Sequence, residues 1–272
     1  MPTLTVPGAE LRYESTGRAS APALLLIPAG IATLRMWDEQ IDALAEDHLV
    51  ARFDPRGFGG TRHDEAVPFA NHADAAAVLD HLGIAEATVI GASRGGRITL
   101  DTALAFPDRV RGVMTIGSEP GGFPDLPLTD EEQRRFDEIE AIDPAIDAAL
   151  LMRLEADVWA VGPTRTEAEV DPAFVRRARE LNAPNAAHAT DDGTVLPLEP
   201  PAYERLGDIR VPALVTVGEY DLSIELAAYD HLLAHLPSAT GARFADTAHL
   251  PSVERPEEFT RVLLDWLERH GL

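Results

Sequence analysis

Short apolar runs alternate along this chain with longer segments whose apolar residues recur at helical spacing, as Trp37, Ile41 and Leu44 do. The apolar runs predict strands at Leu11–Glu14, Ala23–Ile27, Leu49–Phe53, Ala87–Ile90, Val110–Ile116, Ala213–Val217 and Ala242–Phe244. The periodic segments predict helices at Trp37–Glu46, Ala73–Leu82, Arg94–Phe106, Ile224–Leu236 and Pro256–Arg269. Because strands and helices alternate, we expect an α/β fold with a mostly parallel, twisted sheet flanked by helices.

The middle of the chain, residues 119–205, lacks this alternation. Proline and glycine cluster near both of its ends, and its acidic segments predict helices at Thr129–Ile142, Pro144–Trp159 and Pro172–Leu181. Thr129 followed by Glu132 is a capping-box pattern. Long insertions in an α/β core usually cover a site. We therefore expect residues 1–118 and 206–272 to form the core and residues 119–205 a helical lid; plain surface helices are the alternative.

Composition narrows the possible chemistry. The 272 residues contain no cysteine, which excludes disulfides and thiolate catalysis. All 23 basic residues are arginine, so a Schiff-base lysine and a P-loop are excluded as well. The 46 acidic residues give a net charge of −23, which disfavours nucleic acid and anionic membranes as partners. With no signal peptide and no membrane-spanning run, we expect a cytoplasmic protein. Its oligomeric state is not indicated.

The segment Gly91-Ala92-Ser93-Arg94-Gly95 lies between a predicted strand and a predicted helix. This is the G-x-S-x-G pattern of a nucleophile elbow in the context that the pattern requires. Gly91 and Gly95 have no Cβ, so the backbone can turn tightly and expose Ser93. The free N–H groups of the following helix favour negative charge near Ser93. An ordinary N-cap serine is the alternative interpretation.

A serine nucleophile needs a base and an acid that orients the base. On this kind of fold they follow in the chain order serine, acid, histidine. Asp221 comes directly after the predicted strand Ala213–Val217, and His249 lies in a loop before the last helix. Both positions fall at the carboxyl ends of strands, where catalytic groups of α/β sheets gather. We expect Asp221 to be the acid, with Glu219 as the spare carboxylate.

Several motifs resemble those of the α/β-hydrolase superfamily. They are the elbow, Leu24–Gly30 with Arg35–Trp37, Phe53–Gly59, Val217–Asp221 and Thr247–Leu250 followed by Glu254–Glu257. Among its serine-nucleophile branches the chain is most similar to the 3-oxoadipate enol-lactonase-like hydrolases. The resemblance covers the chain outside the predicted lid. It implies that Ser93 is the nucleophile, His249 the general base and Asp221 its orienting acid.

The resemblance also implies an oxyanion hole built from backbone N–H groups. One donor would be Arg94, and the other Gly30 or Ile31, between which the sequence does not choose. The family usually has a His-Gly pair where this chain has Pro28-Ala29-Gly30. Pro28 has no N–H to donate, so the departure affects the shape of the acyl pocket more than the triad.

Three further side chains are candidates for substrate binding. Arg94 or Arg97 could face the pocket and hold a substrate carboxylate, or both could pair with the many acidic residues. The pattern Ser-x-Gly-Gly-Arg that ends at Arg97 resembles the menaquinone-pathway synthase branch of the fold. Trp159 is a candidate pocket wall or lid anchor, which amphipathic packing alone would also explain.

These observations predict a serine hydrolase, an enzyme that cleaves a small carboxylic ester or lactone through an acyl-enzyme. No metal ion or organic cofactor is expected, and the partner is a small-molecule substrate. A lyase or carbon–carbon bond enzyme that uses the same triad is the first alternative. A ligand-binding receptor is the second, and an idle scaffold the third, because fold alone does not decide function.

Overall fold

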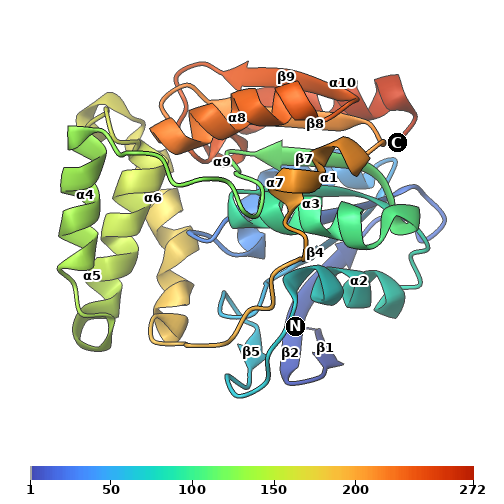
Figure 1. Ribbon diagram of the computed structural model, residues 1–272, viewed down its shortest axis with the longest axis horizontal. Coiled ribbons are helices and arrows are strands. Elements are labelled where there is room, and N and C mark those ends of the chain that lie inside the picture. The colour runs from blue at the N-terminus through green and yellow to red at the C-terminus, as the bar shows by residue number, and fades with distance from the viewer. Residues whose placement is uncertain (1) are drawn as a thin grey trace.

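The computed structural model describes residues 2–272, which fold around one mostly parallel sheet (Figure 1). The strands are β1 (Thr3–Val6), β2 (Ala9–Thr16), β3 (Ala23–Ile27), β4 (Leu49–Phe53), β5 (Arg62–His63), β6 (Ala87–Ala92), β7 (Val110–Ile116), β8 (Ala213–Gly218) and β9 (Ala239–Phe244). Their order is β1-β2-β4-β3-β6-β7-β8-β9, with β5 beside β2. From β4 to β9 every neighbouring pair is parallel, whereas β1, β2 and β5 pair antiparallel.

Helices cover both faces of the sheet. The helices are α1 (Asp38–Ala45), α2 (Asn71–His81), α3 (Arg94–Ala105), α4 (Asp130–Glu140), α5 (Pro144–Ala156), α6 (Pro172–Asn182), α7 (Ala202–Arg205), α8 (Ser223–His235), α9 (Pro251–Glu254) and α10 (Pro256–His270). One apolar cluster joins α2, α3 and α8 to the sheet, and a second joins α1 and α10 to it. This arrangement confirms the predicted fold class.

The central strands are those that the sequence predicts best. The bounds of β3, β4 and β7 agree with the prediction, because these apolar runs are almost entirely buried and need no alternation of polar residues. The prediction missed β1 and β5. Both are short, and β1 alternates exposed with half-buried residues. Their pairing with β2 depends on contacts that no local pattern reports.

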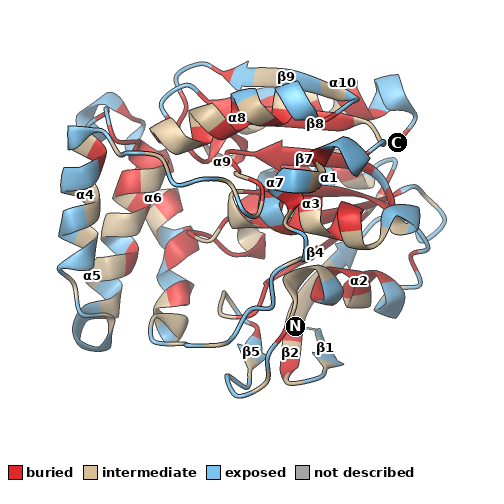
Figure 2. Ribbon diagram, in the orientation of Figure 1, coloured by how far each residue is buried: buried red, intermediate tan, exposed pale blue. Residues whose placement is uncertain are grey.

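Residues 119–205 are here called the helical segment. Its helices α4, α5 and α6 lie beyond the carboxyl ends of the central strands, whereas α7 packs on α3 (Figure 1). Thr129 caps α4 in a complete capping box with Glu132, as predicted. The predicted helix Pro144–Trp159 ends earlier: α5 stops at Ala156, and a π-helical turn spans Asp157–Val161. Figure 2 shows many exposed residues along α4 and α5, whereas the inner face of α6 is buried.

The buried face of α6 shares its apolar cluster with the sheet. Phe174, Val175 and Leu181 belong to the same cluster as Trp37 and Phe259. At its other end the helical segment is joined to the core through a parallel bridge between Phe69 and Val195. The helical segment is therefore packed on the core and has no separate apolar core among the clusters of residues 2–272.

Candidate active site

Ser93 occupies a strained turn between β6 and α3. Its φ of 52° and ψ of −121° place it in the left-handed half of backbone space, which is uncommon for a residue with a Cβ. The flanking glycines are required by space. A Cβ on Gly91 would lie 2.0 Å from the Gly95 carbonyl oxygen, and one on Gly95 would lie 2.3 Å from the Ile27 carbonyl oxygen. The geometry is that of a nucleophile elbow.

Asp221 and His249 form a buried pair. The Nδ1 atom of His249 lies 2.9 Å from both carboxylate oxygens of Asp221, and each side chain is 1 % exposed. The N–H of Leu222 donates a 2.8 Å hydrogen bond to Asp221 and fixes the carboxylate further. An acid that holds Nδ1 leaves Nε2 of the same ring for proton transfer. The structure thus brings together the acid and the histidine singled out in the sequence.

The elbow adjoins this pair through β7. The Ser93 N–H donates a 2.7 Å hydrogen bond to the carbonyl oxygen of Ile116. The next residue, Gly117, packs against the pair: a Cβ there would lie 2.6 Å from Asp221 Oδ2 and 3.0 Å from His249 Nδ1. Ser93, Asp221 and His249 therefore follow the carboxyl ends of β6, β8 and β9 at one edge of the sheet.

The hydrogen bond between nucleophile and base is not made. The Nε2 atom of His249 is buried and has no hydrogen-bond partner within residues 2–272, the Ser93 hydroxyl included. In enzymes without bound substrate this bond is often long and forms only in the substrate complex. The arrangement supplies an oriented base, with Nε2 unused, on the same edge of the sheet as a strained serine.

Backbone N–H groups near Ser93 are free to stabilise an oxyanion. Close packing of Gly95 against the Ile27–Pro28 backbone brings the loop after β3 next to the elbow. Within residues 2–272, neither Gly30 nor Ile31 donates its N–H to a protein acceptor. Arg94 is the first residue of α3, where N–H groups have no partner inside the helix. All three candidates remain available, and the geometry does not choose between Gly30 and Ile31.

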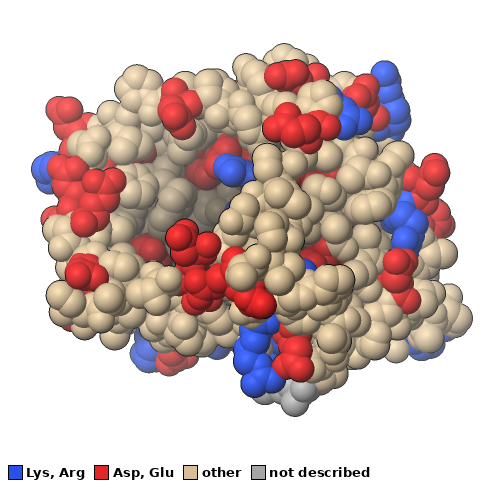
Figure 3. All heavy atoms as spheres, turned by 60° about the horizontal axis from the view of Figure 1, so that its bottom comes forward, with Lys and Arg blue, Asp and Glu red and all other residues tan. Residues whose placement is uncertain are grey.

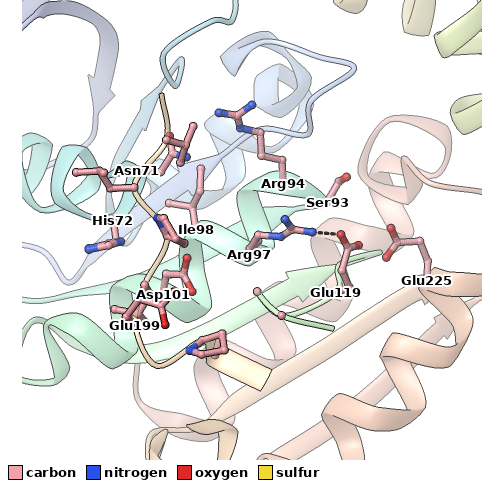
Figure 4. Close-up of a pocket in the computed structure, with 18 of the residues that line it drawn as sticks. Asn71, His72, Ser93, Arg94, Arg97, Ile98, Asp101, Glu119, Glu199 and Glu225 are labelled. Carbon is pink, nitrogen blue, oxygen red and sulfur yellow. Dashed lines mark hydrogen bonds and ion pairs between the residues drawn. The ribbon is translucent and has the colours of Figure 1, made fainter. Parts of the chain in front are cut away.

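A pocket of about 700 Å³ opens beside Ser93, between the helical segment and α3. Figure 3 shows this face of the molecule hollowed, with acidic side chains around the hollow. The side chains that face one another across the pocket come from α3, α8 and the loop after β7 (Figure 4). Those with polar groups include Ser93, Arg94, Arg97, Asp101, Glu119 and Glu225.

Trp159 lies against the base. Its ring centroid is 4.5 Å from that of His249, and the rings are tilted by 46°. The backbone N–H of His249 also donates a 3.3 Å hydrogen bond to the backbone carbonyl oxygen of Trp159. On its other side Trp159 contacts Phe136 of α4 edge-on. Trp159 therefore joins the helical segment to the base and lines the pocket, which is where the sequence predicted it.

Arg94 and Arg97 have different surroundings. Arg97 forms an ion pair with Glu119 at the pocket wall (Figure 4). Arg94 has no carboxylate partner within residues 2–272; its guanidinium lies 4.3 Å from the centroid of the Phe58 ring. Burial, and next the charge of Arg97, lower the pKa of Arg94 to about 10. Of the two alternatives for these arginines, pairing with an acidic residue is observed for Arg97 and not for Arg94, and both side chains line the pocket.

Two acidic residues of the pocket were missed in the sequence. Glu225, in the first turn of α8, is 1 % exposed, and its Oε2 has no partner within residues 2–272. Burial, then the neighbouring carboxylates of Asp221 and Glu119, raise the pKa of Glu225 well above its ordinary value. Burial also raises the pKa of Asp101 to about 6, although the positive charge of Arg97 acts to lower it. Only tertiary packing distinguishes these two from the many surface carboxylates.

A buried ion pair fastens the helical segment to the loop that carries His249. Arg165 binds both carboxylate oxygens of Glu254, at 2.8 and 3.2 Å, and both side chains are less than a tenth exposed. The same guanidinium donates to the Asp246 carbonyl oxygen at 2.7 Å. Glu254 in turn accepts the N–H of Ala248, the residue before His249, at 3.1 Å.

A second link joins α4 to the loop that carries Asp221. The buried carboxylate of Glu132 accepts the Ser223 N–H at 2.6 Å and the Ser223 hydroxyl at 2.8 Å, in addition to its capping bond with Thr129. Burial alone would raise the pKa of Glu132, but the hydrogen bonds from Ser223 and Thr129 together outweigh it and lower the pKa. Ser223 begins α8 two residues after Asp221, so this link supports the acid of the pair.

Comparison with known proteins agrees with this geometry. Residues 22–256 match the family described as alpha/beta hydrolase fold, and the chain belongs to this family.

The chain contains no helix within residues 2–272 that is long and apolar enough to cross a membrane.

Particular relatives cover almost the whole chain. 3-Oxoadipate enol-lactonase 2 of Acinetobacter baylyi is 25% identical over 96% of this chain and 94% of its own length. A 2-hydroxy-6-oxononadienedioate/2-hydroxy-6-oxononatrienedioate hydrolase of Burkholderia vietnamiensis is 26% identical over 96% of this chain and 93% of its own. The crystal structure of the enol-lactonase from Burkholderia xenovorans LB400 superposes with a TM-score of 0.74 at 25% identity, over 98% of this chain and all of that one. These similarities establish an enzyme of the alpha/beta hydrolase class.

Proposed function

We propose that the protein is a serine hydrolase that cleaves a small carboxylic ester or lactone. The observation that carries the proposal is the buried Asp221–His249 pair beside Ser93, a serine held at positive φ on the edge of a 700 Å³ pocket. Relatives named as enol-lactonases support it, because an enol-lactone is a cyclic ester.

In the proposed reaction the Ser93 oxygen attacks the substrate carbonyl carbon while Nε2 of His249 takes the hydroxyl proton. The carbonyl oxygen becomes an oxyanion, which the N–H of Arg94 and that of Gly30 or Ile31 stabilise. When the tetrahedral intermediate collapses, the ester bond breaks and His249 returns the proton to the leaving oxygen. Water then attacks the acyl-enzyme with His249 again as base, which releases the acid and restores Ser93.

Residues 119–205 act in this proposal as a lid that shapes the pocket. Trp159 forms the wall over His249, and Arg97, paired with Glu119, lines the side next to α3. Both are proposed as substrate-binding residues. The reaction requires no metal ion or organic cofactor, because the serine, the histidine and the backbone donors supply the nucleophile, the base and the charge stabilisation.

The test is hydrolysis of short p-nitrophenyl esters and simple lactones by the wild type and by Ser93→Ala. We expect turnover by the wild type and a loss of about 10⁴- to 10⁶-fold in the variant. Ser118→Ala is the matched control, since the Ser118 hydroxyl is bound to the Ile116 carbonyl oxygen at 3.0 Å and does not line the pocket. Equal activity of Ser93→Ala and wild type would contradict the proposal.

Reaction in ¹⁸O-labelled water separates hydrolysis from its alternatives. Hydrolysis places one labelled oxygen in the carboxylic acid product. An elimination product without label would indicate the lyase, and tight binding of the substrate without turnover would indicate the receptor.

A further inference from the structure

Arg94 stands apart from the other arginines of the chain. Within residues 2–272 most arginines form ion pairs with the abundant carboxylates. The others without such a pair are all exposed to solvent, namely Arg18, Arg176, Arg210, Arg255 and Arg261. Arg94 is partly buried, and its Nε is fully buried without a hydrogen-bond partner in this part of the chain. An unpaired buried cation is costly, so its retention beside Ser93 calls for a ligand.

A small cavity of about 170 Å³ adjoins the main pocket at Arg94, which lines both. Arg56 lines the small cavity too. It is 4 % exposed, and its Nε and Nη2 bind Asp74, but its Nη1 is buried with no partner within residues 2–272. Each guanidinium is supported by a phenylalanine: Arg94 by Phe58 at 4.3 Å and Arg56 by Phe69 at 4.6 Å. The cavity is thus lined by two guanidinium groups: that of Arg56 is neutralised by Asp74, and that of Arg94 has no carboxylate partner.

The one carboxylate that lines this cavity is already engaged. Asp191 accepts a 2.8 Å hydrogen bond from His188 and lies 3.8 Å from Nδ1 of His63. It makes no ion pair with either arginine within residues 2–272. No carboxylate that lines the cavity therefore neutralises Arg94, and its guanidinium stays available to an anion that enters from the pocket.

The position of this cavity relates it to the reaction. The Arg94 side chain extends away from the Ser93 hydroxyl (Figure 4). Phe58, on which it rests, would be 3.7 Å from a Cβ on Gly30, so the cation lies next to the loop of the oxyanion hole. A group bound there is separated by several bonds from a carbonyl held at Ser93.

We propose that Arg94 binds a carboxylate of the substrate at this cavity, so that the ester or lactone cleaved at Ser93 is an organic anion. The inference rests on the proposed serine hydrolase function and names its substrate class. A planar guanidinium suits the geometry of a carboxylate, and the Phe58 ring beside Arg94 shields one face of the contact from water. The remainder of the protein, at a net charge of −23, repels anions, so selection depends on this local cationic wall.

The test compares two ester series that differ by one charge. The first contains mono-p-nitrophenyl esters of adipate, pimelate and suberate, whose chains are too long for rapid attack of the carboxylate on its own ester, and the second the same molecules with the free carboxylate capped as a methyl ester. For the wild type we expect kcat/KM to be higher for the anionic member of at least one pair. In Arg94→Gln the ratio of anionic to capped kcat/KM is expected to fall about 10- to 100-fold. Arg94→Lys, which keeps the positive charge, should recover part of the wild-type preference for the anionic ester.

Arg261→Gln is the matched control, because it removes one positive charge from an exposed arginine of α10 that does not line either cavity. Its ratio should equal that of the wild type. An unchanged ratio in folded Arg94→Gln, or an equal fall in Arg261→Gln, would overturn the proposal. Thermal unfolding of each variant identifies a loss of fold.

Binding to Ser93→Ala separates this inference from the proposed function. Calorimetry with glutarate or adipate should show heat of binding that disappears in Ser93→Ala/Arg94→Gln. If the diacid binds in an Arg94-dependent way but the wild type hydrolyses no ester, the anion site is supported and the proposed hydrolase function is refuted. Ester hydrolysis with no Arg94-dependent binding and no charge preference would refute the anion site alone.

Discussion

The edge of the sheet and the helical segment above it are held in place by different forces. Ser93 and Asp221 follow β6 and β8, whose residues are all buried, and His249 lies in a buried turn after the edge strand β9. The helical segment shares apolar contacts with the core mainly along α6 and the turn around Ala160, and polar links, among them those of Arg165 and Glu132, also join it to the core. Its outer part is poorly packed: Ile146 of α5 is 82% exposed.

This difference separates the chemistry from the choice of substrate. The groups proposed for catalysis sit on elements that dense packing keeps rigid. The groups that shape the pocket belong partly to helices with few buried contacts, which open at lower free energy than the core. Changes at the sheet edge should therefore alter the reaction without altering stability, whereas changes at the two polar links should alter stability first.

The largest effect on activity, apart from loss of Ser93, is expected at the acid of the buried pair. Asp221→Asn keeps the shape but removes the charge that orients His249, so kcat should fall about 10³- to 10⁴-fold. The free energy of unfolding should change much less. The control is Glu219→Gln, an exposed carboxylate two residues away, which should keep wild-type activity. Ester kinetics and urea unfolding measure both quantities. Similar losses in both variants would refute the assignment.

The largest effect on stability is expected at the link to the His249 loop. Arg165→Met leaves the buried carboxylate of Glu254 without its partner, which should lower the free energy of unfolding by about 3–5 kcal/mol. Arg153→Met, which removes an exposed ion pair with Asp157, should cost no more than about 1 kcal/mol. Chemical denaturation compares the two. If they were equally destabilising, the helical segment would not depend on Arg165.

A smaller, pH-dependent effect is expected at the link to α8. Glu132→Gln removes the charge that accepts from Ser223 and Thr129, at a cost of about 1–2 kcal/mol at pH 7. Because the folded-state pKa of Glu132 lies below its ordinary 4.5, its contribution is present above that pH and is lost as the pH falls through the folded pKa. The free energies of unfolding of the wild type and the variant should therefore become equal at acidic pH. Glu138→Gln, exposed on the same helix, should match the wild type throughout.

A pH-dependent effect of the opposite sign is expected at Glu225. Its folded-state pKa is raised, so its contribution to stability is present below pH 4.5 and is lost as the pH rises through the folded value. Glu225→Gln stays neutral and should unfold at a higher temperature than the wild type at pH 8, with no difference near pH 4.5. Thermal unfolding of both proteins between pH 4.5 and pH 8 measures the difference in melting temperature. A gap that is independent of pH would show that Glu225 is not the titrating group.

The sequence predicts the sheet edge better than the helical segment. Buried strands such as Leu49–Phe53 carry their signal in a few consecutive apolar residues, and the glycines around Ser93 reveal a turn that only they permit. Chain order alone then points to Asp221 and His249, which the structure places in contact.

The remaining features depend on contacts between distant residues. The π-helical turn that follows the end of α5 at Ala156 carries Trp159, whose contact with His249 is not indicated by the local pattern. Nothing in the pattern around Glu225 indicates that two other carboxylates face it. Likewise, adjacent arginines in one helix turn gave no sign that Arg97 finds a carboxylate and Arg94 does not.

The most direct measurement of the central claim is intact-mass analysis after treatment with a fluorophosphonate probe, which modifies serines activated for acyl transfer. We expect one adduct on the wild type, mapped to Ser93 by peptide sequencing, strongly reduced labelling in Asp221→Asn, and none in Ser93→Ala. A folded wild-type protein that stays unmodified, or one labelled at another residue, would contradict the claim that Ser93 is the nucleophile.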